Sequence, residues 1–257
     1  MCWLAAGVTP AAEPRSAGRA GAQGRPSARD DLTGRPTVIV RKGLAQGSGT
    51  IVWSAKGESL VLTAAHVVKE AGPLAVELHR YNVGREREAN HGEWPRRCPG
   101  AVAAADAAAD LAIVRLGGLP ALPYVARLAP GDEEPERGAV LTSVGIDHGS
   151  RLTSWNTRLT AVIWLKLEGE RAERPFLVTE QFPEQGRSGG GLYAVDGGLI
   201  GVCVGRVGGG KEKKTVGLFA SSASIRRLLR DHDLDGTLLR TPADRPVRGK
   251  ARAQPSP

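Results

Sequence analysis

Cysteine is scarce in this chain of 257 residues, which contains only Cys2, Cys98 and Cys203. Three widely separated cysteines are too few for a disulfide framework. The sequence has no CxxC pair, and no histidine and cysteine stand at a zinc-binding spacing. We therefore expect neither a metal nor any other cofactor. Cys203 lies in the apolar run GLIGVCVG and is expected to be a small buried core residue.

Long apolar runs are also missing, because no stretch approaches the roughly 20 residues needed to cross a bilayer. An integral membrane segment is therefore not expected. The opening MCWLAAGVTPAAEP has a short apolar part followed by small residues, as at the end of a signal peptide, but it has no positively charged start. We expect a secreted or periplasmic protein, with the cytoplasm as the alternative location.

Acidic residues are outnumbered by basic ones, and a formal net charge of +8 raises the question of a nucleic-acid partner. Much of this excess lies near the ends of the chain, since residues 1–36 carry +2 and residues 241–257 carry +3. Both stretches are rich in Ala, Gly, Pro, Arg and Ser, a composition that cannot bury a core. We therefore predict disordered segments over 1–36 and 233–257, and no binding to nucleic acid.

Helical periodicity is nearly absent before the stretch SSASIRRLLRDHDL. From Thr37 onward, short runs rich in β-branched residues, such as TVIV, GTIVW, LAIVRL and TVGLFA, are separated by Gly, Pro or charged turns. The pattern predicts an all-β protein with one short C-terminal helix at about 223–231. Ile225, Leu228 and Leu229 fall on one face of this helix, and a serine is available as its N-cap.

The stretch 117–138 is rich in proline and glycine and divides the strands into two sets. The first set runs over about 37–116 and the second over about 139–220. Two β barrels or sandwiches joined by a linker are the natural interpretation.

One serine, Ser188, stands among four glycines in the stretch EQGRSGGGL. His66 follows the strand-like run SLVLTAA, and Asp110 precedes the run LAIVRL. Taken singly, a rim histidine and a turn carboxylate are ordinary structural residues. Together the three supply what acyl transfer to a serine requires: a nucleophile, a base to take its proton and a carboxylate to orient that base. Glycines beside the serine would let backbone N–H groups approach a developing oxyanion.

The blocks VLTAAHVV, DLAIVRL and EQGRSGGGL resemble the three catalytic blocks of chymotrypsin-fold serine proteases, most closely the bacterial HtrA/Deg and glutamyl-endopeptidase-like branch. The resemblance extends over about residues 37–232. It implies two six-stranded Greek-key barrels with the active site between them, and a serine endopeptidase that acts on proteins or peptides. It also implies that His66 is the general base, Asp110 the orienting carboxylate and Ser188 the nucleophile, with the backbone N–H groups of Gly186 and Ser188 as the oxyanion hole.

The chain departs from this family at the residue before the serine. Arg187 stands where the digestive members have an aspartate that pairs with a freshly cleaved N-terminus. Their activation by cleavage is therefore not expected here, and a large cation beside the oxyanion hole is unusual. The cysteines that flank the histidine in secreted animal members are missing as well, so stability must come from packing.

The resemblance also places the substrate pocket, lined by Phe182, Val204, Gly205, Arg206 and Gly217. An aromatic residue at the base of the pocket, where trypsin-like members have an acid, disfavours cleavage after Arg or Lys. Small or aliphatic side chains are the expected preference, with acidic ones as the alternative because of Arg206.

Other functions fit the sequence less well. GRSGG matches the GxSxG nucleophile elbow of α/β-hydrolases, but glycines and strands follow the serine where that fold requires a helix. GRVGGGKE resembles a phosphate-binding loop but has a glutamate where magnesium binding requires Ser or Thr. The main alternative is a catalytically inactive, protease-like domain that binds peptides or serves as a scaffold. No PDZ domain is expected after the helix, and the sequence does not predict an oligomeric state.

Overall fold

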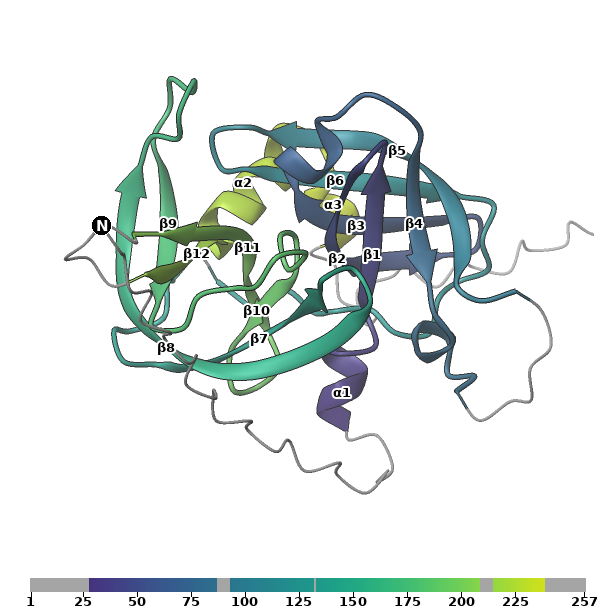
Figure 1. The fold of residues 1–257 in the computed structure, drawn as a ribbon, viewed down its shortest axis with the longest axis horizontal. Coiled ribbons are helices and arrows are strands. Elements are labelled where there is room, and N and C mark those ends of the chain that lie inside the picture. Colours follow the sequence, from purple (N-terminus) through teal and green to yellow (C-terminus); the bar gives the residue numbers. More distant parts are fainter. Residues whose placement is uncertain (1–27, 87–92, 132, 209–214, 239–257) are drawn as a thin grey trace, which may run out of the picture.

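The computed structural model describes residues 28–86, 93–131, 133–208 and 215–238. It contains two closed, six-stranded antiparallel barrels and a short C-terminal helix (Figure 1), as the sequence predicts. Within these ranges, no helix is both long enough and apolar enough to cross a membrane. Cys2 lies outside the described residues.

The first barrel is built from six strands: β1 (Thr37–Lys42), β2 (Ala45–Ala55), β3 (Glu58–Ala64), β4 (Leu74–Leu78), β5 (Arg96–Asp106) and β6 (Leu111–Gly117). Around the barrel they follow the order β1-β2-β3-β6-β5-β4. Two short 3₁₀ helices, η1 (Ala65–Val68) and η2 (Arg80–Val83), leave the ends of β3 and β4. The first of them carries the predicted catalytic histidine.

The second barrel repeats this topology with the strands β7 (Val140–Asp147), β8 (Arg151–Leu165), β9 (Arg174–Thr179), β10 (Gly191–Tyr193), β11 (Leu199–Val207) and β12 (Val216–Ser221). Starting from β7, the order is β7-β8-β9-β12-β11-β10, which matches that of the first barrel strand for strand. Between β6 and β7 the described chain has no helix or named strand, only an isolated bridge from Leu128 to Leu199.

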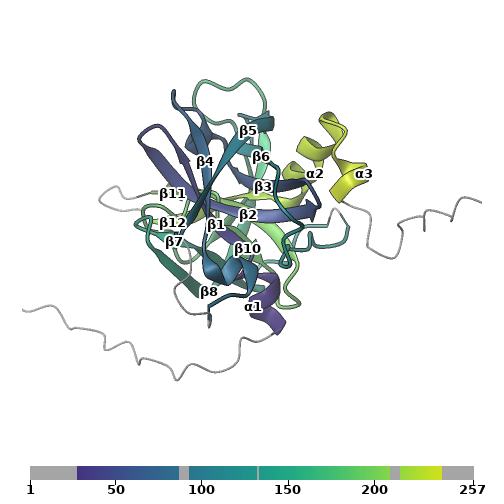
Figure 2. The ribbon, with the colours of Figure 1, turned by 90° about the vertical axis from the view of Figure 1, so that its right-hand side faces the viewer.

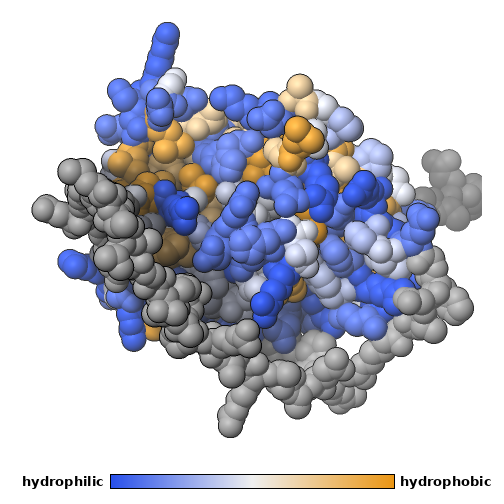
Figure 3. Space-filling view, viewed as in Figure 1, coloured by the Kyte–Doolittle hydropathy of each residue, from blue (hydrophilic) through white to orange (hydrophobic). Residues whose placement is uncertain are grey.

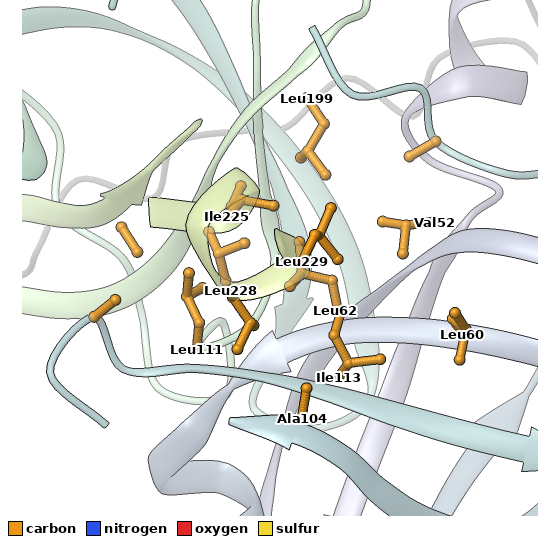
Figure 4. Packing of buried hydrophobic residues seen from close by; sticks show 14 of the residues in the cluster. Val52, Leu60, Leu62, Ala104, Leu111, Ile113, Leu199, Ile225, Leu228 and Leu229 are labelled. Atoms are coloured by element: carbon orange, nitrogen blue, oxygen red, sulfur yellow. The ribbon is translucent and has the colours of Figure 1, made fainter. Parts of the chain in front are cut away.

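Three apolar clusters explain why several strands are apolar on both faces. One cluster fills the first barrel and includes Val61, and another fills the second barrel and includes Cys203, which is buried as predicted. The third lies between the barrels and includes Leu60 and Leu62 of β3 together with residues of the C-terminal helix (Figure 4). Successive residues of β3 therefore face two different cores, and the period-two alternation of a half-exposed strand is lost.

The C-terminal helix α2 (Ser222–Asp231) packs against strands of both barrels. Ser221 caps its first turn by accepting a hydrogen bond from the N–H of Ser224. Its predicted apolar face, Ile225, Leu228 and Leu229, packs into the third cluster beside residues of the first barrel (Figure 4). The helix thus begins on the last strand of the second barrel and buries its apolar side in the cluster between the two barrels.

Parts of the segments predicted to be disordered are packed. Residues 28–36 form the short helix α1 (Ala28–Leu32) and a turn, where Arg29 donates to the hydroxyl of Thr142 (2.7 Å) and Arg35 lies over the Tyr124 ring. After α2, a short helix α3 (Asp235–Leu238) lies beside it (Figure 2). The composition of residues 28–36 does not predict this order, because Arg29 and Arg35 bind residues that are distant in the sequence.

Candidate active site

His66 lies at the mouth of the first barrel because β3 ends in small residues and continues directly into η1. Val67 and Val68 are buried and anchor this short turn. The imidazole on its other side remains 48% exposed. The local sequence AAHVV thus presents a histidine to solvent from a rigid strand end.

Asp110 holds His66 at two points. Its Oδ1 accepts a hydrogen bond from the backbone N–H of His66 (2.8 Å), and its Oδ2 lies 2.6 Å from Nδ1 of the ring. The carboxylate side chain is only 10% exposed. With the Nδ1 hydrogen directed to the carboxylate, Nε2 is the nitrogen that can accept a proton.

The turn that carries Asp110 has support that the sequence analysis missed. Asp110 adopts a left-handed conformation (φ 54°) between β5 and β6. Asp106 accepts hydrogen bonds from the N–H groups of Ala108 (3.0 Å) and Ala109 (3.3 Å), and its other oxygen accepts one from Arg174 of β9 (2.9 Å). The second barrel therefore braces the carboxylate turn of the first. An aspartate four positions before Asp110 was the available signal, since Asp favours such turns.

Ser188 lies in the turn before β10, where the second barrel meets the first. Its carbonyl oxygen accepts a hydrogen bond from the N–H of Ser48 on β2 (2.7 Å). A Cβ atom on Gly47 would lie 2.7 Å from the same oxygen and 2.6 Å from a methyl carbon of Val67. Because Val67 directly follows His66, this close approach brings Ser188 beside the turn that carries the imidazole.

The hydroxyl of Ser188 lies 3.4 Å from the carbonyl oxygen of Val204, a long and weak hydrogen bond. The described residues show no hydrogen bond between Ser188 Oγ and the His66 ring. Asp110 and His66 are thus in direct contact, and Ser188 is the third residue that the fold brings to the same junction.

The glycines after the serine are required by close contacts. Gly189 has a φ of +88°, and a Cβ there would lie 2.0 Å from the carbonyl oxygen of Ser48 and 2.3 Å from the hydroxyl of Thr63. A Cβ on Gly190 would lie 2.5 Å from the carbonyl oxygen of Val144. Any side chain at these positions would push the serine turn away from both barrels.

The predicted oxyanion-hole residues, Gly186 and Ser188, lie at a type II turn. The N–H of Arg187 donates to the carbonyl of Glu184 (3.3 Å), and Gly186 occupies the third position with a φ of +92°. The carbonyl of Gln185 accepts a hydrogen bond from the N–H of His148 (2.7 Å), so the N–H of Gly186 points the opposite way across the planar peptide. Neither Gly186 nor Ser188 donates its N–H to another described residue, which leaves both N–H groups open to an oxyanion.

Arg187 does not crowd this turn. Its side chain is fully buried and forms an ion pair with Asp147 at the end of β7. The guanidinium therefore lies inside the second barrel and not beside the predicted oxyanion hole.

Cys203 lies next to the serine turn without taking part in its chemistry. Its carbonyl accepts from the N–H of Gly189 and its N–H donates to the carbonyl of Gly190, both at 2.8 Å. Burial raises the pKa of its thiol to about 12, so the sulfur stays protonated and unreactive.

The predicted pocket residues lie together on the second barrel beside Ser188. Arg206 of β11 pairs with Gly217 of β12, and its guanidinium lies 5.7 Å from the centre of the Phe182 ring. Phe182 is 38% exposed, so its ring reaches the rim of this region. Figure 3 shows an apolar area at the left of the face, where Figure 1 draws β8, β9 and β12. The remaining two predicted pocket residues, Val204 and Gly205, lie at a bulge in β11.

No cluster of His, Cys, Asp or Glu suited to a metal occurs among the described residues.

A family model of the trypsin-like peptidase domain matches residues 47–202 of the chain. The chain belongs to the trypsin-like peptidase family. This matched region contains His66, Asp110 and Ser188. No curated protein matches the sequence.

Solved structures of three proteases share the fold at low sequence identity. The active form of the Rv3671c protease from M. tuberculosis is 21% identical, with a TM-score of 0.60 over 79% of this chain and 83% of that one. The serine endoprotease from Yersinia pestis is 21% identical, with a TM-score of 0.59 over 83% and 69%. The HtrA-type protease AlgW with a tripeptide is 20% identical, with a TM-score of 0.62 over 82% and 64%.

Proposed function

We propose that this trypsin-like peptidase is a serine endopeptidase that hydrolyses peptide bonds through an acyl-enzyme intermediate. The observation that carries the proposal is the two-point contact between Asp110 and His66, at 2.8 and 2.6 Å, beside a glycine-flanked serine. This arrangement supplies an oriented base and a hydroxyl at the junction of two rigid barrels.

In the first half of the reaction, Ser188 Oγ attacks the carbonyl carbon of the substrate while His66 Nε2 takes the hydroxyl proton. The hydroxyl reaches the ring by rotating away from the weak contact with Val204. Asp110 stabilises the resulting imidazolium through Nδ1. The N–H groups of Gly186 and Ser188 stabilise the negative charge on the substrate oxygen, and His66 then protonates the leaving amine.

In the second half, a water molecule replaces the departed amine. His66 takes a proton from this water, whose oxygen attacks the acyl carbon bound to Ser188. The proton then passes back to Ser188 Oγ as the carboxylic acid leaves. All proton transfers run through one nitrogen, which is why the orientation of the ring by Asp110 matters in both halves.

The pocket residues support a preference other than Arg or Lys. Arg206 places a positive charge against Phe182 at the rim, and like charges repel a basic substrate side chain. We propose small, aliphatic or acidic residues at the cleavage position. A digest of a peptide library with mass-spectrometric mapping of the cut sites would test this proposal, and cleavage mainly after Arg or Lys would contradict it.

The contact between Ser188 Oγ and Val204 favours one alternative, a protease-like domain that binds peptides without cutting them. A fluorophosphonate probe distinguishes the two functions. We expect the folded protein to be labelled at Ser188 and the Ser188→Ala variant to lose both labelling and peptide hydrolysis, with an unchanged melting temperature. Ser154→Ala, at an exposed serine of β8, is the matched control and should behave as wild type. Full turnover by Ser188→Ala would refute the proposed mechanism.

A further inference from the structure

Arg187 is fully buried, and all three of its guanidinium nitrogens donate hydrogen bonds. Its Nε and Nη2 donate to Oδ1 and Oδ2 of Asp147, both at 2.9 Å, and its Nη1 donates to the hydroxyl of Ser143 (3.2 Å). The hydroxyl of Thr153 accepts a hydrogen bond from Nη2 of Arg187 and donates one to Oδ2 of Asp147. The guanidinium carbon lies 4.9 Å from the centre of the Trp155 ring. A bidentate arginine–carboxylate pair of this kind has a defined direction as well as strength.

The two residues before Arg187 are tied to the same strand end. His148 N–H binds the carbonyl of Gln185 (2.7 Å). The hydroxyl of Ser48 donates to the carbonyl of Gly186 (2.9 Å) and accepts from the N–H of Ile146 (2.8 Å). Three consecutive residues of the serine turn are therefore bound, directly or through one hydroxyl, to residues 146–148.

These contacts determine where the oxyanion-hole donors point. The N–H of Ser188 belongs to the peptide bond that Arg187 forms with it, and the N–H of Gly186 belongs to the peptide bond whose carbonyl His148 holds. A planar peptide fixes its N–H once its other atoms are held. The ion pair of Arg187 anchors the residue that adjoins the Ser188 peptide, and His148, next to Asp147, holds the Gly186 peptide.

We propose that Arg187 and Asp147 are positioning residues whose buried ion pair holds the oxyanion hole in its working arrangement within the intact, uncleaved chain. This inference rests on the proposed function. Both partners are side chains far from the ends of the sequence, so the pair forms without cleavage to create a new N-terminus. In the digestive members the residue before the serine is an anionic aspartate and its partner is a cationic terminal amine. Here the residue before the serine is the cation, Arg187, and its partner is the anion, Asp147.

Kinetics on the purified full chain test the proposal. Asp147→Asn keeps the shape of the side chain but removes its charge, and Arg187→Gln removes the cation. We expect either change to lower kcat about 100-fold or more per active site titrated with the fluorophosphonate probe, with KM changed less than about 3-fold, because the donors act on the transition state. Arg187→Lys keeps the charge without the bidentate geometry and should fall in between.

Glu77→Gln is the matched control, since Glu77 is a buried carboxylate of the first barrel that accepts hydrogen bonds from two arginines. Its kcat per titrated site should equal that of wild type. A merely structural role would lower the number of titrated sites in Asp147→Asn but not the kcat of each. Unchanged kcat in Asp147→Asn and Arg187→Gln would overturn the proposal, as would activity that appears only after cleavage of the chain, detected by intact mass.

Hydrogen–deuterium exchange separates this inference from the proposed function. Amides of residues 184–190 should exchange at least about 10-fold faster in Asp147→Asn than in wild type, and at the wild-type rate in Glu77→Gln. If wild type and Ser188→Ala both lack activity while this difference holds, the proposed function fails and the positioning role stands. If wild type is active but Asp147→Asn shows neither slower turnover nor faster exchange, the positioning role fails alone.

Discussion

Replacing Asp110 by asparagine tests the geometry of the site with the smallest change in shape. An asparagine can still accept a hydrogen bond from the backbone N–H of His66 through Oδ1, which accounts for the 2.8 Å contact. Its NH₂ group would then face Nδ1 across the 2.6 Å contact and could bind only an unprotonated nitrogen. The ring hydrogen would move to Nε2, and the base would be lost.

The expected loss follows from this tautomer change. Holding the ring in the wrong tautomer costs about 10⁴-fold in kcat in triads of this type, or about 5.4 kcal/mol of transition-state stabilisation. The free energy of unfolding should change by only about 1 kcal/mol, because one neutral hydrogen bond replaces a charge-assisted one.

Steady-state hydrolysis of a peptide that wild type cleaves, together with denaturant unfolding, measures both quantities. A kcat for Asp110→Asn within 10-fold of wild type, in a protein of unchanged stability, would refute the assignment of Asp110 as the orienting carboxylate. Asp106→Asn is the informative comparison, since it weakens the turn without touching the ring. Its loss of kcat should be much smaller.

Three further predictions concern residues outside the triad. Gly189→Ala should lower the free energy of unfolding by about 3 kcal/mol or more in thermal or denaturant melts, since its Cβ would meet backbone atoms at 2.0 Å and φ is +88°. Cys203 should resist alkylation in the native protein, followed by mass spectrometry. Burial raises the pKa of Glu77, but the hydrogen bonds from Arg41 and Arg97 lower it by more, so the pKa lies below its usual value. Glu77→Gln should therefore cost about 2 kcal/mol at pH 7, a difference that shrinks as the pH falls through the lowered pKa.

Much of the architecture could be predicted because it is written in local patterns. The β-branched runs between Gly and Pro turns gave the strands, and Ile225, Leu228 and Leu229 gave the buried face of α2. Segment 28–36 was harder, because its composition is that of a disordered tail. Its order comes from Arg29 binding Thr142, 113 residues away, a contact that no local pattern contains.

The site divides in the same way. His66, Asp110 and Ser188 could be proposed because each residue type has a defined chemical role and a distinctive flank. Apart from Asp106, which lies four positions before Asp110, the residues that hold them in place could not, because their contacts connect distant parts of the chain. Ser48 and Gly186 are 138 residues apart, and Asp147 and Arg187 are 40 residues apart. His148 acts through its backbone N–H, so its side-chain identity carries no signal of this role.

Arg187 shows how far sequence reasoning could have gone. An arginine between a glycine and a nucleophilic serine has little room beside the oxyanion hole, so its guanidinium must either reach solvent or be buried. A buried guanidinium requires a carboxylate, because an unpaired charge in the interior costs several kcal/mol. The residue type thus predicts an acidic partner if the side chain is buried. It cannot say which of the 27 acidic residues supplies it, because that depends on how β7 lies beneath the serine turn. The structure selects Asp147, at the strand end that we propose positions the oxyanion hole.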